Sequence, residues 1–293
     1  MEFGLLALIW GSSFLLMKVG LESLQPLQIA TLRIVLGAAT IVCCTYATGQ
    51  RLPTAWRDWR QLAVMGFFLA VLPFTLFAMS EKTIPSALAG IGNATTPLAT
   101  VLAMLALVPR HRASRQQVVA IIVGFCGVVT IMQPWAVAGR PDLGGFAMAI
   151  GGGASYGVGW SYAARVRMNE RVQGLAQSAA TLVAASVLMV PVFVVGGLAS
   201  PGGLGGLFTV ASPDWLPIAA IVTLGVVGTG LAYILFFDVI AQAGAVVGST
   251  VTYLIPVVSV LLGVLVLHEQ LGIWQLVGFA IVLGAAWVIN RRP

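Results

Sequence analysis

Charged side chains are scarce in this sequence. They make up 8% of its 293 residues, whereas 59% of the residues are hydrophobic. An ordinary soluble domain carries roughly 25% charged and 45–50% apolar residues. Too little polar surface therefore remains to cover a water-soluble globule. Glycine is abundant, with 34 residues, as is usual in membrane helices. The composition predicts an all-α integral membrane protein with short loops and no soluble domain.

Residue types that support metal binding and catalysis are also few. Cys43, Cys44 and Cys126 lie inside apolar runs and form neither a spaced metal motif nor a disulfide framework. His111 and His268 are the only histidines, and both lie in loops. The sequence contains no HExxH motif, no paired-aspartate motif and no Ser/His/Asp set. We therefore expect no enzyme activity, no metal and no cofactor.

Apolar runs separated by charge, proline or glycine clusters predict ten transmembrane helices, since one span needs about 20 apolar residues. The expected ranges are 3–21, 28–48, 61–80, 86–107, 116–136, 143–163, 174–196, 216–238, 245–266 and 273–290. The first run has no basic segment before it and no cleavage site after it. We therefore expect a retained helix there rather than a signal peptide.

Basic residues outnumber acidic ones and give a net charge of +6. They lie in loops between apolar runs, which argues against a nucleic-acid-binding surface and indicates the cytoplasmic bias of membrane proteins. With the N-terminus in the cytoplasm, eleven of the fifteen basic residues fall inside: Arg51, Arg57, Arg60, Arg110, Arg112, Arg115, Arg165, Arg167, Arg171, Arg291 and Arg292. Outside loops contain only Lys82 and Arg140. We expect a multi-pass protein with both termini cytoplasmic.

An internal duplication relates the two halves of the chain. Residues 66–107 align with residues 225–266 at a constant offset of 159. The matched pairs are Gly66 with Gly225, Phe77 with Phe236, and Pro97 with Pro256. Five helices per half is an odd number, so the second half must insert upside down. We expect two inverted five-helix repeats, covering residues 1–140 and 141–293.

The fourth and ninth predicted helices carry matching faces of small or polar residues around a proline. These faces are Gly90, Asn93, Pro97 and Thr100, and Ser249, Thr252, Pro256 and Ser259. Such stripes are most often packing surfaces between helices. Each proline also removes a backbone hydrogen bond and frees the carbonyl four residues back, that of Asn93 or Thr252. Paired interrupted helices point to the central site of a transporter, so we expect both prolines to line the pathway.

No carboxylate lies deep inside a predicted span. Loops or helix ends contain all nine of them: Glu2, Glu22, Asp58, Glu81, Asp142, Glu170, Asp214, Asp238 and Glu269. Proton-coupled transporters usually carry an ionisable relay in the membrane. We therefore expect facilitated transport or exchange of neutral or zwitterionic solutes, with a flux that persists when the proton gradient is collapsed. A channel is the alternative, although channels usually show a filter ring formed by oligomeric symmetry.

Four motifs carry a family resemblance. They are Trp10-Gly11-Ser12-Ser13-Phe14, Pro26 followed by Arg33, Ala87 through Pro97, and Pro256 through His268-Glu269-Gln270-Leu271. Together they resemble the drug/metabolite transporter superfamily, EamA type, over nearly the whole chain. Within it the chain looks most like the YddG-type amino-acid exporters.

The resemblance implies a basket of ten helices around a central cavity in the bacterial inner membrane. It also implies export of amino acids, often aromatic or broadly neutral ones. Some relatives carry aromatic residues where this chain has Ala94 and Thr96, so we expect broad specificity. Export of another metabolite or a drug is the alternative. A nucleotide sugar is disfavoured, because no basic cluster lies in the membrane to hold a diphosphate.

Side chains on the predicted internal faces are candidates for holding an amino acid without a buried charge. Aromatic faces attract an ammonium group by ~0.5–2 kcal/mol, and hydroxyls and helix N-termini can bind a carboxylate. The candidates are Trp10, Ser13, Phe14, Phe74, Phe77, Asn93, Thr96, Pro97, Tyr156, Trp160, Tyr233, Phe237, Thr252, Tyr253 and Pro256. Packing, or a place in the aromatic belt of the interface, is the alternative for each aromatic residue.

Lys18 and Arg33 are the only bases within the predicted spans. Both lie near the outer ends of their helices, so we expect the side chains to extend to the interface. The alternative is a salt bridge with Glu22, Glu81 or Glu269, which makes Lys18, Arg33 and Glu269 candidates for an outer gate. The expected partners are the lipid bilayer and an amino-acid-like solute, and a monomer is sufficient for such a pathway.

Overall fold

The computed structural model describes residues 2–108, 112–136, 142–199, 203–206, 214–258 and 272–290, and every element in these ranges is helical. The elements of the first half are α1 (Glu2–Gly11), α2 (Ser13–Gly20), α3 (Pro26–Ala47), α4 (Trp56–Gly66), η1 (Phe67–Val71), α5 (Leu72–Ser80), α6 (Ser86–Asn93), α7 (Thr96–Leu107), α8 (Arg115–Met132) and η2 (Pro134–Ala136). Those of the second half are α9 (Leu143–Arg165), α10 (Met168–Arg171), α11 (Gly174–Leu198), α12 (Gly203–Gly206), α13 (Trp215–Gly225), η3 (Val226–Leu231), α14 (Ala232–Ser249), η4 (Thr250–Tyr253) and α16 (Ile273–Asn290).

Six helical stretches are long and apolar enough to cross a membrane. They are Pro26–Ala47, Trp56–Ser80, Leu88–Leu107, Arg115–Ala136, Gly174–Leu198 and Trp215–Ile240. Three shorter apolar helices are Gly4–Gly20, Gln242–Val258 and Ile273–Ala285. The glycine-rich helix α9 has 23 residues but is not among the six. The protein is thus a multi-pass membrane protein, while the count of ten helices and the inverted repeat stay predictions.

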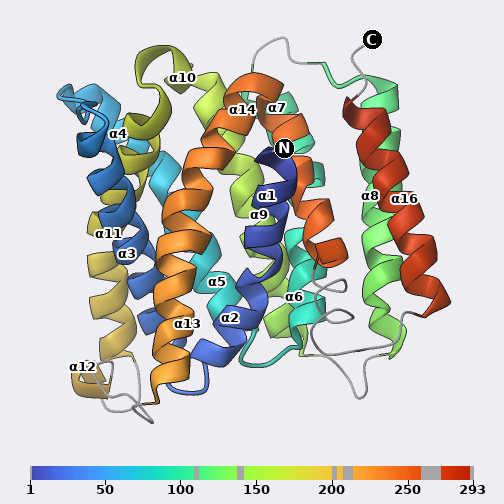
Figure 1. Cartoon of the computed structure of the whole chain (residues 1–293), viewed down its shortest axis with the longest axis horizontal. Coiled ribbons are helices and arrows are strands. Elements are labelled where there is room, and N and C mark those ends of the chain that lie inside the picture. The colour runs from blue at the N-terminus through green and yellow to red at the C-terminus, as the bar shows by residue number, and fades with distance from the viewer. Residues whose placement is uncertain are drawn as a thin grey trace.

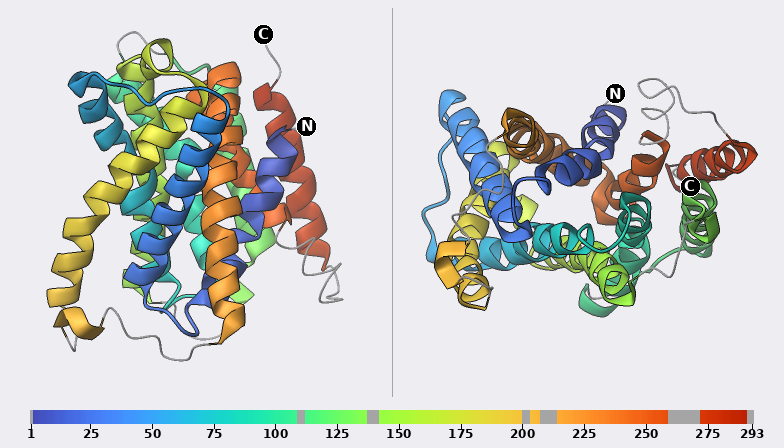
Figure 2. Two further views of the ribbon diagram at one scale, coloured as in Figure 1. Left: turned by 60° about the vertical axis from the view of Figure 1, so that its left-hand side comes forward. Right: turned by 90° about the horizontal axis from the view of Figure 1, so that it is seen from below.

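The helices stand side by side in one bundle (Figures 1 and 2). In its interior α9 packs against α5, α6 and α7, and α3 packs against α11, α13 and η3. The helices α8 and α16 pack along each other at one edge of the molecule, as both figures show. The short helices α1 and α2 lie on the near side of the bundle in Figure 1, where α2 packs on α13.

Basic side chains gather at one end of the bundle. Arg165, at the end of α9, donates to the carbonyl of Leu107 at the end of α7, with 2.6 Å between nitrogen and oxygen. Arg171 on α10 pairs with Asp58 in the first turn of α4. Figure 1 shows that the start of α1 and the end of α16 point to this same end. We call the opposite end, where α2, α5 and α11 finish, the distal end.

Several predicted helices are interrupted. The first breaks at Ser12, between α1 and α2, and the fourth breaks at Ala94 and Thr95, between α6 and α7. The predicted range 245–266 is described only as far as residue 258, and there η4 interrupts α-helical geometry and ends three residues before Pro256. The chain turns at Gly244, whose φ of 82° and ψ of 166° suit glycine because it has no Cβ.

Two segments of π-helix were not expected. The segment η1 begins at Phe67 and η3 begins at Val226, both inside long membrane-crossing stretches. Their starting residues are separated by the offset of 159 that aligns the two halves of the sequence. A π-helix leaves backbone carbonyls outside the usual i→i+4 ladder and is frequent at functional sites. These two segments border the site described next.

Candidate functional site

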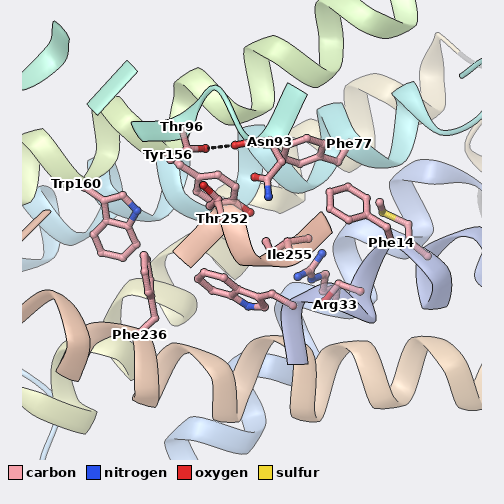
Figure 3. A pocket seen from close by; sticks show the side chains of 13 residues that line it. Phe14, Arg33, Phe77, Asn93, Thr96, Tyr156, Trp160, Phe236, Thr252 and Ile255 are labelled. Atoms are coloured by element: carbon pink, nitrogen blue, oxygen red, sulfur yellow. Dashed lines mark hydrogen bonds between the residues drawn. The ribbon is translucent and has the colours of Figure 1, made fainter. Parts of the chain in front are cut away.

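A narrow cavity of about 40 Å³ lies in the interior of the bundle. Helices from both halves of the chain supply its wall. The lining residues are Trp10, Ser13, Phe14, Met17, Arg33, Phe77, Asn93, Thr96, Tyr156, Trp160, Phe236, Thr252 and Ile255. Figure 3 shows Phe14 and Phe77 at one end of this cavity and Trp160 and Phe236 at the other.

Aromatic rings form most of the wall. Phe236 packs edge-on between Trp10 and Trp160, with ring centroids 4.6 and 4.5 Å apart. At the other end Phe14 meets Phe77 at 5.6 Å, also edge to face, and Tyr156 stacks on Phe77 at 6.2 Å. Such pairs contribute about 0.5–1.5 kcal/mol beyond their buried area. The rings hold one another in place and present both faces and edges to the cavity.

Arg33 brings a positive charge into this aromatic wall. Its side chain is buried, with 6% of its surface exposed, so the prediction that it extends to the interface is wrong. The Nε–H group donates to Thr229 Oγ1 at 2.8 Å, and the guanidinium carbon lies 3.8 Å from the centroid of the Phe74 ring. Among the described residues no ion pair or hydrogen bond engages its two terminal nitrogens.

A buried guanidinium without a counter-charge costs free energy in a membrane bundle and marks a functional site by default. The Thr229 hydrogen bond and the Phe74 ring fix the plane of the group while its terminal N–H groups stay available. This geometry suits a carboxylate, which a guanidinium binds through two parallel hydrogen bonds. Arg33 and Asn93 approach the cavity from opposite sides (Figure 3).

Polar lining residues are largely engaged with the backbone. The Thr96 hydroxyl donates to the carbonyl of Asn93 at 2.7 Å and lies 3.1 Å from the carbonyl of Gly153. The Asn93 carbonyl that was expected to be free for a solute is therefore already bonded. Thr252 donates in the same manner to Ser249, at 2.9 Å. The Asn93 side-chain amide is the polar group of the fourth predicted helix that faces the cavity.

The π-helical segments anchor side chains of the cavity wall. Trp10 Nε1 donates to the carbonyl of Gly228 in η3 at 3.2 Å. Tyr233 donates its hydroxyl to the carbonyl of Leu69 in η1. Gly228 and Leu69 are themselves 159 residues apart, so repeat-related carbonyls accept aromatic donors in the two halves. Ser155 bonds to the neighbouring carbonyl of Phe68 at 2.7 Å.

Nine of the fifteen predicted pathway residues line the cavity, and six do not. Those that line it are Trp10, Ser13, Phe14, Phe77, Asn93, Thr96, Tyr156, Trp160 and Thr252. Those behind the lining are Phe74, Pro97, Tyr233, Phe237, Tyr253 and Pro256, all of them buried. A pathway role for these six residues stays a prediction.

Tyr253 and Phe237 illustrate why some predicted lining residues are displaced. The Tyr253 ring is fully buried and its hydroxyl donates to Ile121 on α8 at 2.7 Å. Phe237 packs behind Trp160, with centroids 5.3 Å apart. The neighbouring Phe236 lines the cavity instead, together with Met17 and Ile255, which were not predicted. The 159-residue alignment of Phe77 with Phe236 was the signal that identifies Phe236.

The predicted outer-gate residues differ in their surroundings. Lys18 is exposed, and its Nζ donates to the backbone carbonyl of Glu81 at 2.9 Å. Neither Lys18 nor Arg33 forms a salt bridge with a described carboxylate. Glu269 lies outside the described residues. The described residues also contain no group of three or more His, Cys, Asp or Glu side chains that could hold a metal ion.

Glu81 is the one acidic residue among the described residues that is buried. It follows the apolar stretch Trp56–Ser80 directly, at the distal end of α5. The position of Glu81 at a helix end was predicted, but the burial of its side chain was not. Its exposed fraction is 0%. Burial raises the pKa of Glu81 to about 8, while the nearby Ser86, Lys18 and Arg33 act to lower it.

Comparison with known proteins identifies the family. The sequence model of the EamA-like transporter family matches residues 3–133 and again residues 143–291. An uncharacterized transporter of Archaeoglobus fulgidus is 26% identical over 97% of this chain and 95% of its own length. The uncharacterized inner membrane transporter YedA of Escherichia coli K12 is 25% identical over 88% of this chain and 79% of its own.

Two further similarities extend over nearly the whole chain. Protein PecM of Dickeya dadantii is 24% identical over 96% of this chain and 89% of its own length. A crystal structure of another protein superposes on this chain with a TM-score of 0.75. That match covers 99% of this chain and 95% of the other at 22% identity, so it shows a shared fold.

Proposed function

Because the chain belongs to the EamA-like transporter family, we propose that it exports neutral and aromatic amino acids by alternating access. The observation that carries this proposal is the buried guanidinium of Arg33 in an aromatic cavity. The guanidinium binds the solute carboxylate, and the ring faces of Trp10 and Trp160 attract the ammonium group and the apolar side chain.

The charge of the cavity disfavours the alternative solutes. An organic cation is repelled by Arg33, and no described carboxylate lines the cavity to hold it. A nucleotide sugar carries a diphosphate, whereas the lining contains a single base. A different small metabolite with one carboxylate is the second candidate, because Arg33 favours it equally. The aromatic lining favours amino acids with a ring or an aliphatic side chain.

We also propose the ten-helix, inverted-repeat architecture with repeats 1–140 and 141–293. The π-helical segments at Phe67 and Val226 support it, because they share the offset of 159 with the sequence duplication. We further propose that both termini lie in the cytoplasm, and the basic residues that gather at one end of the bundle support this orientation. A monomer is the oligomeric state that we propose, since both halves of one chain supply residues to the cavity wall.

Transport in this scheme runs down the solute gradient without a relay of acids across the membrane. Glu81 is the one buried carboxylate among the described residues, and it lies at the distal end rather than beside the middle of the cavity. We expect counterflow in liposomes to persist after an uncoupler collapses the proton gradient. Loss of counterflow on addition of the uncoupler would contradict this part of the proposal.

The central test is counterflow of radiolabelled L-phenylalanine in liposomes that contain the purified protein. We expect neutral amino acids to compete, whereas phenylethylamine, which lacks the carboxylate, and a nucleotide sugar do not. Arg33→Gln should reduce phenylalanine counterflow at least about tenfold, since charge-assisted hydrogen bonds contribute ~1.5–3 kcal/mol each. Arg115→Gln, a matched change at the exposed start of α8, should leave the rate unchanged. Equal competition by phenylethylamine would exclude the carboxylate role of Arg33.

A further inference from the structure

Glu81 is a buried acid that the proposed transport scheme does not use. Its side chain is 0% exposed, and by hydrogen-bond geometry neither carboxylate oxygen has a partner among the described residues. Its amide donates to the carbonyl of Phe77 at 3.0 Å, so it lies one helical turn beyond a residue that lines the cavity. An ionised carboxylate in such a place lacks the pairing that buried charges need.

Two cations face this carboxylate from neighbouring helices, and neither pairs with it. Lys18 on α2 uses its ammonium group for the backbone carbonyl of Glu81. Arg33 on α3 uses Nε for Thr229 and stacks on Phe74. Ser86 at the start of α6 lies near the carboxyl group and acts to lower the pKa of Glu81. The positive charges of Lys18 and Arg33 favour the ionised form of Glu81, and its burial opposes them more strongly.

We propose that Glu81 is a proton-binding site that is linked to the solute site through the charge of Arg33. A carboxylate bound at Arg33 cancels the positive charge that favours ionised Glu81, so the proton affinity of Glu81 rises when the solute binds. The linkage is reciprocal. Protonated Glu81 leaves Arg33 without a competing anion, which strengthens solute binding. This inference rests on the proposed function only for the identity of the solute carboxylate.

The linkage requires no movement of protons across the membrane. Glu81 lies at the distal end of α5, so a proton can enter and leave from that side while the solute gradient drives transport. The expected sign follows from the pKa of about 8 in the empty protein. Below that pH Glu81 is mostly protonated with or without solute, and affinity depends little on pH. Above it solute binding takes up as much as one proton, so Kd rises by up to about tenfold per pH unit.

Calorimetric titration of the purified protein with L-phenylalanine at about pH 8.5 measures this proton uptake. Runs in two buffers with different ionisation enthalpies give the number of protons bound. We expect net uptake in the wild type and markedly less in Glu81→Gln. Glu22→Gln, a matched change at an exposed residue of the same end, should behave as the wild type does. Equal proton uptake in Glu81→Gln and the wild type overturns the linkage while leaving the proposed function intact.

A second measurement needs no solute and keeps Glu81 in place. Infrared spectra across a pH titration should show a protonated carboxyl band at about pH 7 that disappears as the pH rises through about 8. In Arg33→Gln the band should persist to higher pH, because one of the charges that favour ionisation is gone. If phenylalanine fails to bind, the proposed function fails and this titration still decides the linkage. Absence of the band at about pH 7, or an identical titration in Arg33→Gln, overturns the proposal.

Discussion

Trp10 joins the cavity wall to the helix behind it. Its ring meets Phe236 at 4.6 Å, and its N–H group donates to Gly228 in a π-helical segment. We expect Trp10→Ala to raise the KM for phenylalanine by about tenfold or more, because both the ring face and its aromatic contact are lost. Trp10→Phe keeps a ring and should show a smaller rise. Liposome counterflow at matched protein content measures both.

Tyr156 stacks on Phe77 at the other end of the cavity, so its replacement tests the cavity at a second place. Tyr156→Ala should weaken transport in the same way as Trp10→Ala. Trp274→Ala serves as the control, because Trp274 on α16 is 53% exposed and lies outside the cavity. Full transport in both cavity variants at normal expression would mean that the cavity is not the solute site.

Glu81 also makes the stability of the protein depend on pH. Its pKa is raised by burial to about 8 from an ordinary value of 4.5, so the folded state holds a proton that the unfolded state releases. The stabilisation is complete below pH 4.5, decreases through the interval and is lost once the pH passes about 8. We expect the apparent Tm of the wild type in detergent to fall between about pH 5 and 8 more steeply than that of Glu81→Gln.

Thermal unfolding between about pH 5 and 8 is measured in the same detergent on the wild type, Glu81→Gln and a third protein. The third is Glu22→Gln, in which an exposed acid of the same end is replaced. Its Tm profile should follow the wild type. Parallel profiles for all three proteins would show that Glu81 does not hold a proton in the folded state.

At the scale of the elements, apolar periodicity was enough to locate most helices. The predicted range 273–290 coincides with α16, and 143–163 differs from α9 by two residues at one end. The predicted start of another helix is too late, because the prediction excluded the charged residues before the apolar run. Trp56 begins α4 five residues before the predicted residue 61, because the polar first turns of a membrane helix still form helix outside the apolar core.

The π-helical segments could not be predicted, since no residue pattern distinguishes them from an α-helix. A π-helical turn contains an extra residue, which rotates the face of everything that follows it. Phe236, which follows η3, lines the cavity, whereas Phe237 packs behind Trp160. The interruptions at Ala94 and at η4 change the faces of the fourth and ninth helices in the same manner.

Arg33 was misjudged for a different physical reason. Sequence places it near a helix end, where a long basic side chain normally extends to the interface. Its actual partners, Phe74 and Thr229, come from α5 and from η3 of the other half. Contacts between segments almost two hundred residues apart cannot be predicted from a single sequence. The proline pair and the aromatic candidates could be predicted from the sequence, because they follow from spacing within single helices.

The contact between α7 and α9 offers a test at the same scale. A Cβ atom on Gly157 would lie 2.6 Å from the amide nitrogen of Thr100 and 2.7 Å from the carbonyl carbon of Ala99. Because these are backbone atoms, the helices must separate to accept it. We expect Gly157→Ala to destabilise the protein by about 1–3 kcal/mol, seen as a lower apparent Tm in detergent. Gly284→Ala on α16, where nothing lies within 4 Å, should leave the Tm unchanged or raise it.

At the scale of the whole molecule, charge and burial divide the protein into two unequal ends. The end that carries α10 and the starts of α4 and α8 is rich in arginine, and Arg171 pairs there with Asp58. The distal end presents Lys18 and Lys82 and contains the buried Glu81. Since Glu81 lies at the distal end of α5, the compartment that sets the pH of this site depends on orientation.

Orientation is therefore the prediction that decides which compartment faces Glu81. The positive-inside rule places the arginine-rich end in the cytoplasm. In a background without Cys43, Cys44 and Cys126, Lys82→Cys should react with a membrane-impermeant maleimide on intact cells. Arg51→Cys, equally exposed at the opposite end, should react only after the membrane is permeabilised. The reverse pattern would place Glu81 on the cytoplasmic side, whereas the predicted pattern leaves the proton at Glu81 in exchange with the outside medium.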